Sequence, residues 1–198
     1  MKKYETFWLN YLRPNIFVRD ISKINVRNLK IRGIKLIVCD LDNTLVPHFS
    51  KYPNKFAFDF LSKVNLEQID IIIASNNTKK RVTKFYEKLK MQAKVNAVIW
   101  NSKKPFSRKI KKYIKENNYN FNEVIFIGDQ FITDIFLANR LKAKSILVLP
   151  LIDQSQTISI NTFFRFIEKY IYKRLTHENI LNHDNLNKEM SEYEYELL

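Results

Sequence analysis

Short apolar runs alternate with amphipathic segments along most of this chain. Five nearly continuous apolar runs, of the kind that form strands buried on both faces of a sheet, cover residues 34–40, 69–75, 97–100, 123–128 and 145–150. Between these runs, apolar residues recur at every third or fourth position, which predicts helices over residues 54–64, 78–90, 105–114 and 133–142. The pattern therefore predicts strands and helices in alternation.

Alternating strands and helices are typical of an α/β fold with right-handed crossover connections. We expect one doubly wound parallel sheet, built from residues 34–176. Residues 1–33 are predicted to be a basic lead-in that packs on this core, and residues 177–198 an acidic, flexible tail. Such sheets bind ligands at the carboxyl ends of their strands, near the point where the strand order reverses.

One further amphipathic helix is predicted over residues 162–175, after the last strand. Its apolar stripe consists of Phe163, Phe166, Ile167, Tyr170, Ile171 and Leu175. Stripes of this kind usually face a protein core, and we expect the same here. The alternative is docking on a membrane surface, which Lys169, Lys173 and Arg174 would favour.

The chain of 198 residues contains a single cysteine, Cys39. A disulfide framework and a multi-cysteine metal site are therefore excluded, and a reducing, cytoplasmic location is expected. Cys39 lies inside the first apolar run, where a core role is more common than a nucleophilic one. Because no apolar run approaches the length of a membrane span, we expect a soluble protein.

The net charge of +14 is concentrated in one part of the chain. Residues 79–115 contain 14 lysines or arginines and one acid, Glu87. A concentrated basic surface attracts polyanions such as nucleic acid, anionic lipid or phosphorylated ligands. The alternative is a solvated face in a protein encoded by an AT-rich genome, since isoleucine and asparagine are also abundant and glycine occurs only twice.

Polar residues gather where the predicted strands end. They are Asp40, Asp42 and Thr44 after the first strand, Ser75 and Asn76 after the second, Lys104 after the third, and Asp129 and Asp134 after the fourth. Lys103 competes with Lys104, but the position before Pro105 favours Lys104. Because the carboxyl ends of parallel strands meet at one edge of a sheet, we expect these side chains to lie close together.

These residue types suit phosphoryl transfer. Several carboxylates around one point cannot all remain ionised without a cation, and coordination by oxygen atoms alone suits Mg²⁺. One aspartate can attack phosphorus to form an aspartyl-phosphate, and a second can protonate the leaving oxygen and later activate water. Ser75, the main-chain amides of Asn76 and Asn77, and Lys104 can stabilise the transferred group.

In the order and type of these residues, the chain resembles the haloacid dehalogenase superfamily of phosphohydrolases. Its four motifs are similar to DLDNT at residues 40–44, Ser75, Lys104, and Gly128-Asp129 followed by Asp134. The longer stretches DLDNTLVP, SNN and GDQ-x-x-TD resemble the YqeG-type class IIIA phosphatases. That group is related to the mitochondrial phosphatidylglycerophosphate phosphatase.

The resemblance implies a role for each of these residues. Asp40 would be the nucleophile and Asp42 the general acid and base, with Lys104 as a further catalytic residue. The implied phosphate-binding residues are Thr44, Ser75, Asn76 and Lys104. The implied Mg²⁺ site uses Asp40, the main-chain carbonyl of Asp42, Asp129, and Asp134 as a ligand or as support for the ligands.

Short connections suggest a site without a cap domain. Only about 26 residues separate Leu45 from Ile71, so we expect an open site that favours a large substrate or a phosphate on a surface. The resemblance favours phosphatidylglycerophosphate as substrate, with peripheral contact to an anionic membrane. The alternatives are a phosphatase of soluble sugar or nucleotide phosphates or of phosphoproteins, and a basic protein that binds RNA or ribosomes. The intact acidic residues argue against the nucleic-acid alternative.

Overall fold

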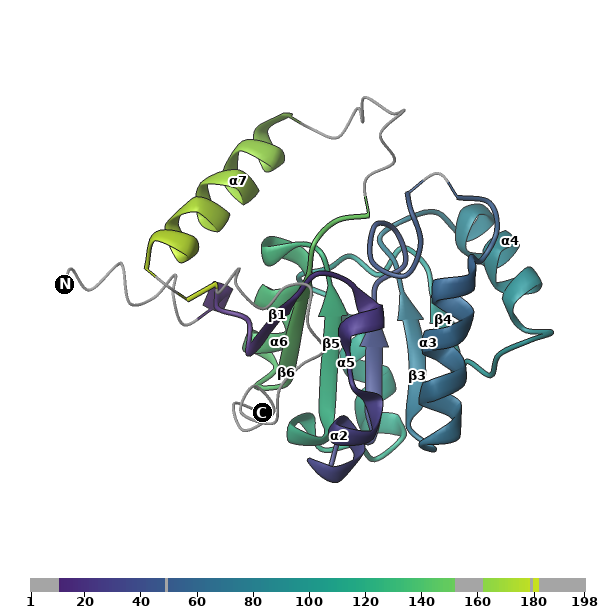
Figure 1. Cartoon of the computed structure of the whole chain (residues 1–198). Helices are drawn as coiled ribbons and strands as arrows, with labels where there is room; N and C mark the ends of the chain where they lie inside the picture. The colour runs from purple at the N-terminus through teal and green to yellow at the C-terminus, as the bar shows by residue number, and fades with distance from the viewer. Residues whose placement is uncertain (1–10, 49, 152–161, 179, 182–198) are drawn as a thin grey trace.

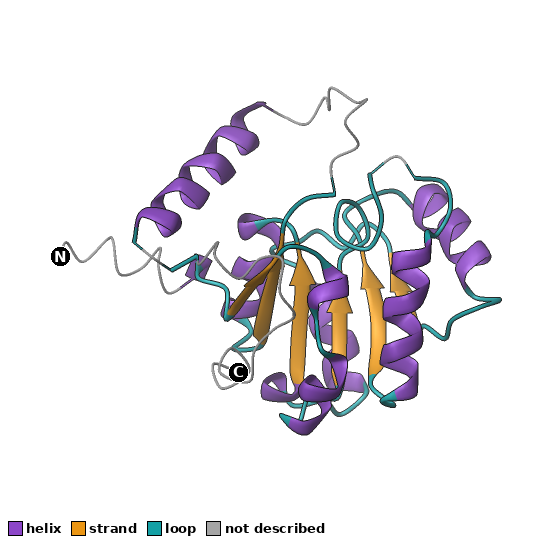
Figure 2. Cartoon of the chain, viewed as in Figure 1, coloured by secondary structure: helices purple, strands orange, loops and turns teal. Residues whose placement is uncertain are grey.

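A parallel sheet of six strands forms the centre of the molecule, with helices against both of its faces (Figure 1, Figure 2). The computed structural model describes residues 11–48, 50–151, 162–178 and 180–181. The strands are β1 (Ile16–Val18), β2 (Leu36–Cys39), β3 (Asp70–Ala74), β4 (Ala97–Ile99), β5 (Val124–Gly128) and β6 (Lys144–Val148). Their order in the sheet is β1-β6-β5-β2-β3-β4, which confirms the predicted doubly wound α/β fold.

The strand order reverses at β2, which pairs with β3 on one side and with β5 on the other. The chain builds one half of the sheet through β3 and β4, crosses back, and adds β5 and β6 to the other half. Cys39 lies opposite both Ile73 and Ile127, so the three central strands end close to one level. The loops after these strands therefore meet at the reversal point, where α/β proteins bind ligands.

Helices cover the two faces of the sheet in two groups. The elements are η1 (Ile21–Lys23), α2 (Val26–Ile31), α3 (Lys55–Leu66), α4 (Lys79–Leu89), α5 (Arg108–Glu116), η2 (Phe121–Glu123) and α6 (Phe136–Arg140). Along β2, Ile37 and Cys39 pack with residues of α2, α3 and α4, whereas Leu36 and Val38 pack with residues of α5 and α6. Both sets are buried, as expected for a strand that is covered on both faces.

The first 33 residues contribute a strand that the apolar pattern does not predict. β1 pairs in parallel with β6 at the edge of the sheet. Asn15 supports this pairing, because its side-chain oxygen accepts a hydrogen bond from the Ser145 main-chain nitrogen at 2.9 Å. The Asn15 main-chain nitrogen in turn donates a hydrogen bond to the Ser145 hydroxyl at 3.2 Å. A run of three apolar residues is too short to be distinguished from a loop by its pattern, so the sequence does not predict β1.

Two helices begin at other residues than predicted. The helix expected from Pro105 begins at Arg108, because Ser107 caps its first turn. Residues 104–106 thus remain in the loop after β4. The helix expected over residues 133–142 begins earlier, with a π-helical turn η3 (Phe131–Ile135), and continues as α6.

The last helix, α7 (Thr162–His177), divides the predicted apolar stripe. Ile171 and Leu175 are buried, at 8% and 2% exposure, against residues of β1 and β6. Phe166 and Tyr170 are 71% and 61% exposed. The core interpretation is therefore correct for the first pair and wrong for the second, since among the described residues of this stripe Phe166 and Tyr170 are exposed.

Most of the predicted acidic tail lies outside the described residues, as does the side chain of Phe163. Leu181, near the end of the described chain, is 2% exposed and packs with the same cluster as α7. Among the described residues, no helix has both the length and the apolar character needed to cross a membrane.

Leu61 and Leu66 lie on the same helix, α3, but only Leu61 is buried, at 0% against 81% exposure. Leu61→Ala leaves a cavity between α3 and the sheet, so we expect it to lower the free energy of unfolding by about 2–5 kcal/mol. Leu66→Ala is the matched control and should change that free energy by less than about 0.5 kcal/mol. Urea unfolding followed by circular dichroism measures both, and equal losses would contradict this packing of α3.

Candidate active site

The side chains predicted at the strand ends converge at the carboxyl edge of the sheet. Most of them line one cavity of about 410 Å³. The predicted residues in its wall are Asp40, Asp42, Ser75, Asn76, Lys104 and Asp134, and the wall also includes Asn43, His48, Asn77, Gln130 and Thr133. The cavity lies where β2 and β5 end, at the reversal of the strand order.

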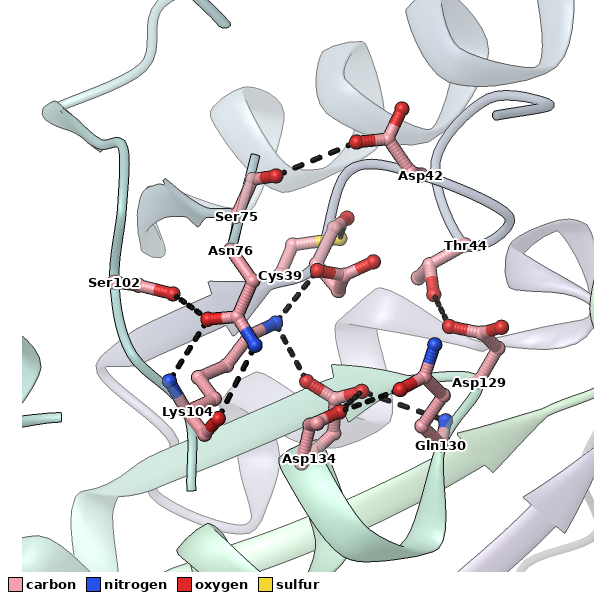
Figure 3. Close-up of polar contacts among 12 residues, drawn as sticks. Cys39, Asp42, Thr44, Ser75, Asn76, Ser102, Lys104, Asp129, Gln130 and Asp134 are labelled. Atoms are coloured by element: carbon pink, nitrogen blue, oxygen red, sulfur yellow. Dashed lines mark hydrogen bonds and ion pairs between the residues drawn. The ribbon is translucent and has the colours of Figure 1, made fainter. Parts of the chain in front are cut away.

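A buried lysine holds two of the carboxylates together. Lys104 Nζ lies 2.5 Å from an oxygen of Asp40. It also lies 2.6 Å from an oxygen of Asp134 (Figure 3). The Lys104 side chain is 2% exposed, so both ion pairs are shielded from water. Lys103, by contrast, is exposed and has a φ of 56°. Of the two lysines, the structure brings the predicted one, Lys104, to the site.

Asn76 fixes the main chain of Lys104. Its side-chain oxygen accepts hydrogen bonds from the Lys104 main-chain nitrogen at 2.8 Å and from the Ser102 hydroxyl at 2.7 Å. Its side-chain nitrogen donates to the Lys104 carbonyl oxygen at 3.1 Å. The loop after β3 is thereby attached to the loop after β4. Because the side chain is used in this contact, the phosphate-binding role predicted for Asn76 rests on its main-chain amide.

Thr44 supports the aspartate that follows β5. Its hydroxyl donates a hydrogen bond to an Asp129 carboxylate oxygen at 3.3 Å. Thr44 is fully buried, at 0% exposure. The structure thus places this hydroxyl against Asp129 rather than open to the cavity, which differs from the phosphate contact predicted for it.

The turn after β5 holds Asp134 close to the strand. Asp134 accepts hydrogen bonds from the Thr133 hydroxyl at 3.0 Å and from the Gln130 main-chain nitrogen at 3.4 Å. A Cβ atom on residue 128 would overlap the Asp134 carboxyl group, so this close approach requires Gly128. The position of the carboxylate that pairs with Lys104 therefore depends on a residue without a side chain.

Asp42 faces away from the Lys104 ion pairs and has its own donors. One of its oxygens accepts a hydrogen bond from the Arg81 guanidinium at 3.0 Å. The other accepts from the Ser75 hydroxyl at 3.3 Å and from the Asn77 side-chain nitrogen at 3.4 Å. Figure 3 shows the carboxylate turned toward Ser75 and apart from Lys104. The loop after β3 and the start of α4 thus determine where the predicted acid and base lies.

Three buried carboxylates share one buried ammonium group. Burial raises the pKa of Asp40 to about 7, an effect that Lys104 opposes and Asp134 strengthens. Burial, Asp40 and Asp134 together raise the pKa of Asp129 well above its usual range. Burial alone would lower the pKa of Lys104, but its pairing with Asp134 and Asp40 raises it, so the lysine is charged.

This excess of carboxylates over cations fits a divalent metal ion. The Asp40 and Asp129 carboxylates and the Asp42 main-chain carbonyl are oxygen donors of the type that Mg²⁺ prefers. In the part of the chain that the structure describes, no three histidine, cysteine, aspartate or glutamate side chains converge on one point. Lys104 lies between Asp40 and Asp134, and Asp42 turns away. Asp134, which pairs with Lys104, is thus placed to support the predicted ligands rather than to add a third carboxylate ligand.

Two charged residues beside the site, Arg81 and Glu168, do not line the cavity and are absent from the predicted set. Glu168 of α7 accepts hydrogen bonds from the main-chain nitrogens of Phe131 at 3.0 Å and Ile132 at 2.9 Å, and so attaches α7 to the turn that carries Asp134. Burial raises the pKa of Glu168 to about 7, against the effect of these donors. Glu168 is the only acid between residues 162 and 177, which is a weak sequence signal. Arg81 gives no signal, because it lies in a long basic run.

Cys39 belongs to the core, as expected. It is 0% exposed and lies on the face of β2 that packs with α2, α3 and α4. Burial also raises the pKa of its thiol, which keeps the thiol protonated. Since the thiolate is the reactive form, Cys39 is not a nucleophile in this arrangement.

Known proteins are similar to this chain in sequence. The family described as mitochondrial PGP phosphatase matches residues 9–151. A relative from Bacillus subtilis (strain 168), named "Probable phosphatase YqeG", is 30% identical over 165 residues, which cover 83% of this chain and 92% of the relative.

Solved structures with a similar fold are more distant. A protein from Listeria monocytogenes serotype 4b is 18% identical, with a TM-score of 0.46 over 64% of this chain and 87% of that one. The 3-deoxy-D-manno-octulosonate 8-phosphate phosphatase from Moraxella catarrhalis, solved with magnesium, phosphate and KDO, is 15% identical, with a TM-score of 0.42 over 82% of this chain and 95% of that one. At these values the likeness concerns the fold alone.

The only two glycines in the sequence differ in what a side chain would meet. Gly128→Ala forces a Cβ atom into the Asp134 carboxyl group, so we expect a loss of about 1–3 kcal/mol of unfolding free energy together with a loss of phosphate release. Gly33→Ala meets open space but has a φ of +80°, so it should cost about 1–2 kcal/mol and leave phosphate release unchanged. Urea unfolding and a phosphate assay measure both. Full activity in Gly128→Ala would contradict the placement of Asp134.

Proposed function

Because this chain belongs to the mitochondrial PGP phosphatase family, we propose that it hydrolyses phosphatidylglycerophosphate to phosphatidylglycerol and inorganic phosphate with the help of Mg²⁺. The chain is a phosphatase of the haloacid dehalogenase type. The observation that carries the proposed chemistry is the 2.5 Å ion pair between Lys104 and Asp40, which holds a buried carboxylate in the wall of the cavity.

Two steps through an aspartyl-phosphate account for the reaction. In the first, an Asp40 carboxylate oxygen attacks phosphorus, the bond from phosphorus to the ester oxygen breaks, and Asp42 gives its proton to the leaving oxygen. In the second, Asp42 takes a proton from water as the water oxygen attacks phosphorus. The bond between phosphorus and Asp40 then breaks, which releases inorganic phosphate and restores both aspartates.

Donors around the cavity are suited to the charge that develops on the transferred group. Lys104 already lies beside Asp40, so its ammonium would face the oxygens of a phosphoryl group bound there. The Ser75 hydroxyl, which donates to Asp42, and the main-chain amide of Asn76 lie in the same wall. Fixed donors of this kind stabilise a transition state without reorganising during the reaction.

Mg²⁺ would be held by the carboxylates of Asp40 and Asp129 and by the main-chain carbonyl of Asp42. Asp134 would support the site through its contact with Lys104. When bound, the ion would neutralise part of the charge on the phosphate oxygens and on the carboxylates. Thr44, whose hydroxyl bonds to Asp129, would orient one of the ligands.

Short connections around the cavity support a large or surface-bound substrate. The described residues between β2 and α3 form turns and one isolated bridge, between Asp42 and Val46. Lysines of α4 and α5 extend positive charge from the site, and Lys79 and Lys109 lie 5.1 Å and 5.9 Å from the centre of the Trp100 ring. Each basic residue near an anionic membrane contributes about 1 kcal/mol to binding. These features suit a cytoplasmic enzyme in peripheral contact with the membrane that carries its substrate.

A phosphate-release screen tests this proposal. The panel contains phosphatidylglycerophosphate in vesicles, sugar phosphates, nucleotides and phosphopeptides, each with Mg²⁺ and with a chelator. We expect Mg²⁺-dependent release from the lipid at least tenfold faster than from the others, and none from Asp40→Asn, whose circular dichroism should match the wild type. Preference for a soluble phosphate would contradict the lipid substrate, and RNA binding without any hydrolysis would contradict the enzyme.

A further inference from the structure

Arg81, in the first turn of α4, is hydrogen-bonded to two residues of the cavity wall and so lies beside the cavity. It is outside the set of residues that the reaction above uses. Its Nη2 atom donates hydrogen bonds to Asp42 at 3.0 Å and to the main-chain carbonyl of His48 at 3.2 Å. The Arg81 side chain is only 20% exposed. The cation is therefore held in place beside the site, unlike the solvated lysines that surround it in the sequence.

Part of this guanidinium has no partner in the part of the chain that the structure describes. Both hydrogen bonds use Nη2, and neither Nη1 nor Nε of Arg81 has a hydrogen-bond partner among the described residues. The centre of the Phe85 ring lies 5.7 Å from Arg81 Cζ and limits the movement of the guanidinium on one side. A guanidinium presents its donors in a flat fork that matches the paired oxygens of a phosphate or carboxylate group. Arg81 thus keeps donors for an anion while it holds Asp42.

The position of Asp42 fixes which part of a substrate would meet these donors. If Asp42 protonates the leaving oxygen, the leaving group passes beside the Asp42 carboxylate. Arg81 is hydrogen-bonded to that carboxylate, and His48 Nδ1 lies 3.9 Å from it. Lys104 lies instead beside Asp40, on the side of the transferred group. Arg81 therefore borders the leaving group.

We propose that Arg81 is a specificity residue, which binds a second anionic group carried by the leaving group of the substrate. This inference rests on the proposed phosphatase reaction and narrows its substrate class to phosphomonoesters that bear another negative charge. Phosphatidylglycerophosphate has such a group, the phosphodiester that joins its glycerol to the lipid. A simple alkyl or sugar monophosphate does not.

A purely structural role for Arg81 would be to neutralise Asp42. Its removal would then displace Asp42 and slow the hydrolysis of every substrate by the same factor. Recognition of a second anion would instead change the ratio between two substrates that differ only in that anion. The ratio therefore separates the two roles, because any effect transmitted through Asp42 cancels from it.

Two soluble substrates without lipid chains give this ratio. One is glycerol 3-phosphate with a methyl phosphodiester on its other primary hydroxyl, and its partner carries a neutral methyl ether there. For Arg81→Gln, we expect the ratio of kcat/KM for the charged over the neutral substrate to fall about tenfold or more, as for the loss of one charge-assisted hydrogen bond. Arg81→Lys keeps the charge and should retain part of the preference.

Lys84→Gln is the matched control, since Lys84 is an exposed cation on the same helix. It should leave the ratio within about twofold of the wild type, because a screened surface charge contributes little. An unchanged ratio in Arg81→Gln would overturn the inference about Arg81 and leave the phosphatase reaction intact. Wild-type protein that releases phosphate from neither substrate nor from the lipid would overturn both. Thermal unfolding of each variant shows that the comparison is made on folded protein.

Discussion

One buried ammonium paired with two carboxylates is the interaction on which the site depends. Lys104 joins Asp40, at the end of β2, to Asp134, in the turn after β5, and it comes itself from the loop after β4. A charge with so little exposure is stable only when its partners are in place, because removal of one leaves an uncompensated buried charge. The same contacts therefore hold three segments together and fix the carboxylate that would attack phosphorus.

Each member of this group is in turn held by one specific contact. Asn76 fixes the main chain of Lys104 through two hydrogen bonds. Gly128 lets Asp134 approach β5, and Glu168 attaches α7 to the same turn. The chemistry thus depends on elements far apart in the sequence, from the loop after β3 to the last described helix. Asp42 lies outside this group, and Arg81 of α4 holds its carboxylate in place.

The apolar pattern predicts the central strands because strands covered on both faces are continuous apolar runs, and it predicts the convergence of Asp40 and Lys104 because parallel strands end at one edge. It cannot predict β1, because three apolar residues are too few to indicate a strand, and these become one only by pairing with β6. Nor can it predict Arg81, since nothing in a basic run shows which cation meets an aspartate 39 positions earlier. The exposure of Phe166 on α7 likewise follows from which side of the helix meets the core.

The central claim is that Asp40 receives the phosphoryl group. Wild-type protein turning over a substrate labelled with ³²P in its terminal phosphate can be quenched in acid, which preserves an aspartyl-phosphate, and then digested and mapped by peptide. We expect label on the peptide that contains Asp40, lost on exposure to alkali and absent when the same experiment uses Asp40→Asn. Label on another residue, or rapid turnover with no labelled peptide at any quench time, would contradict it.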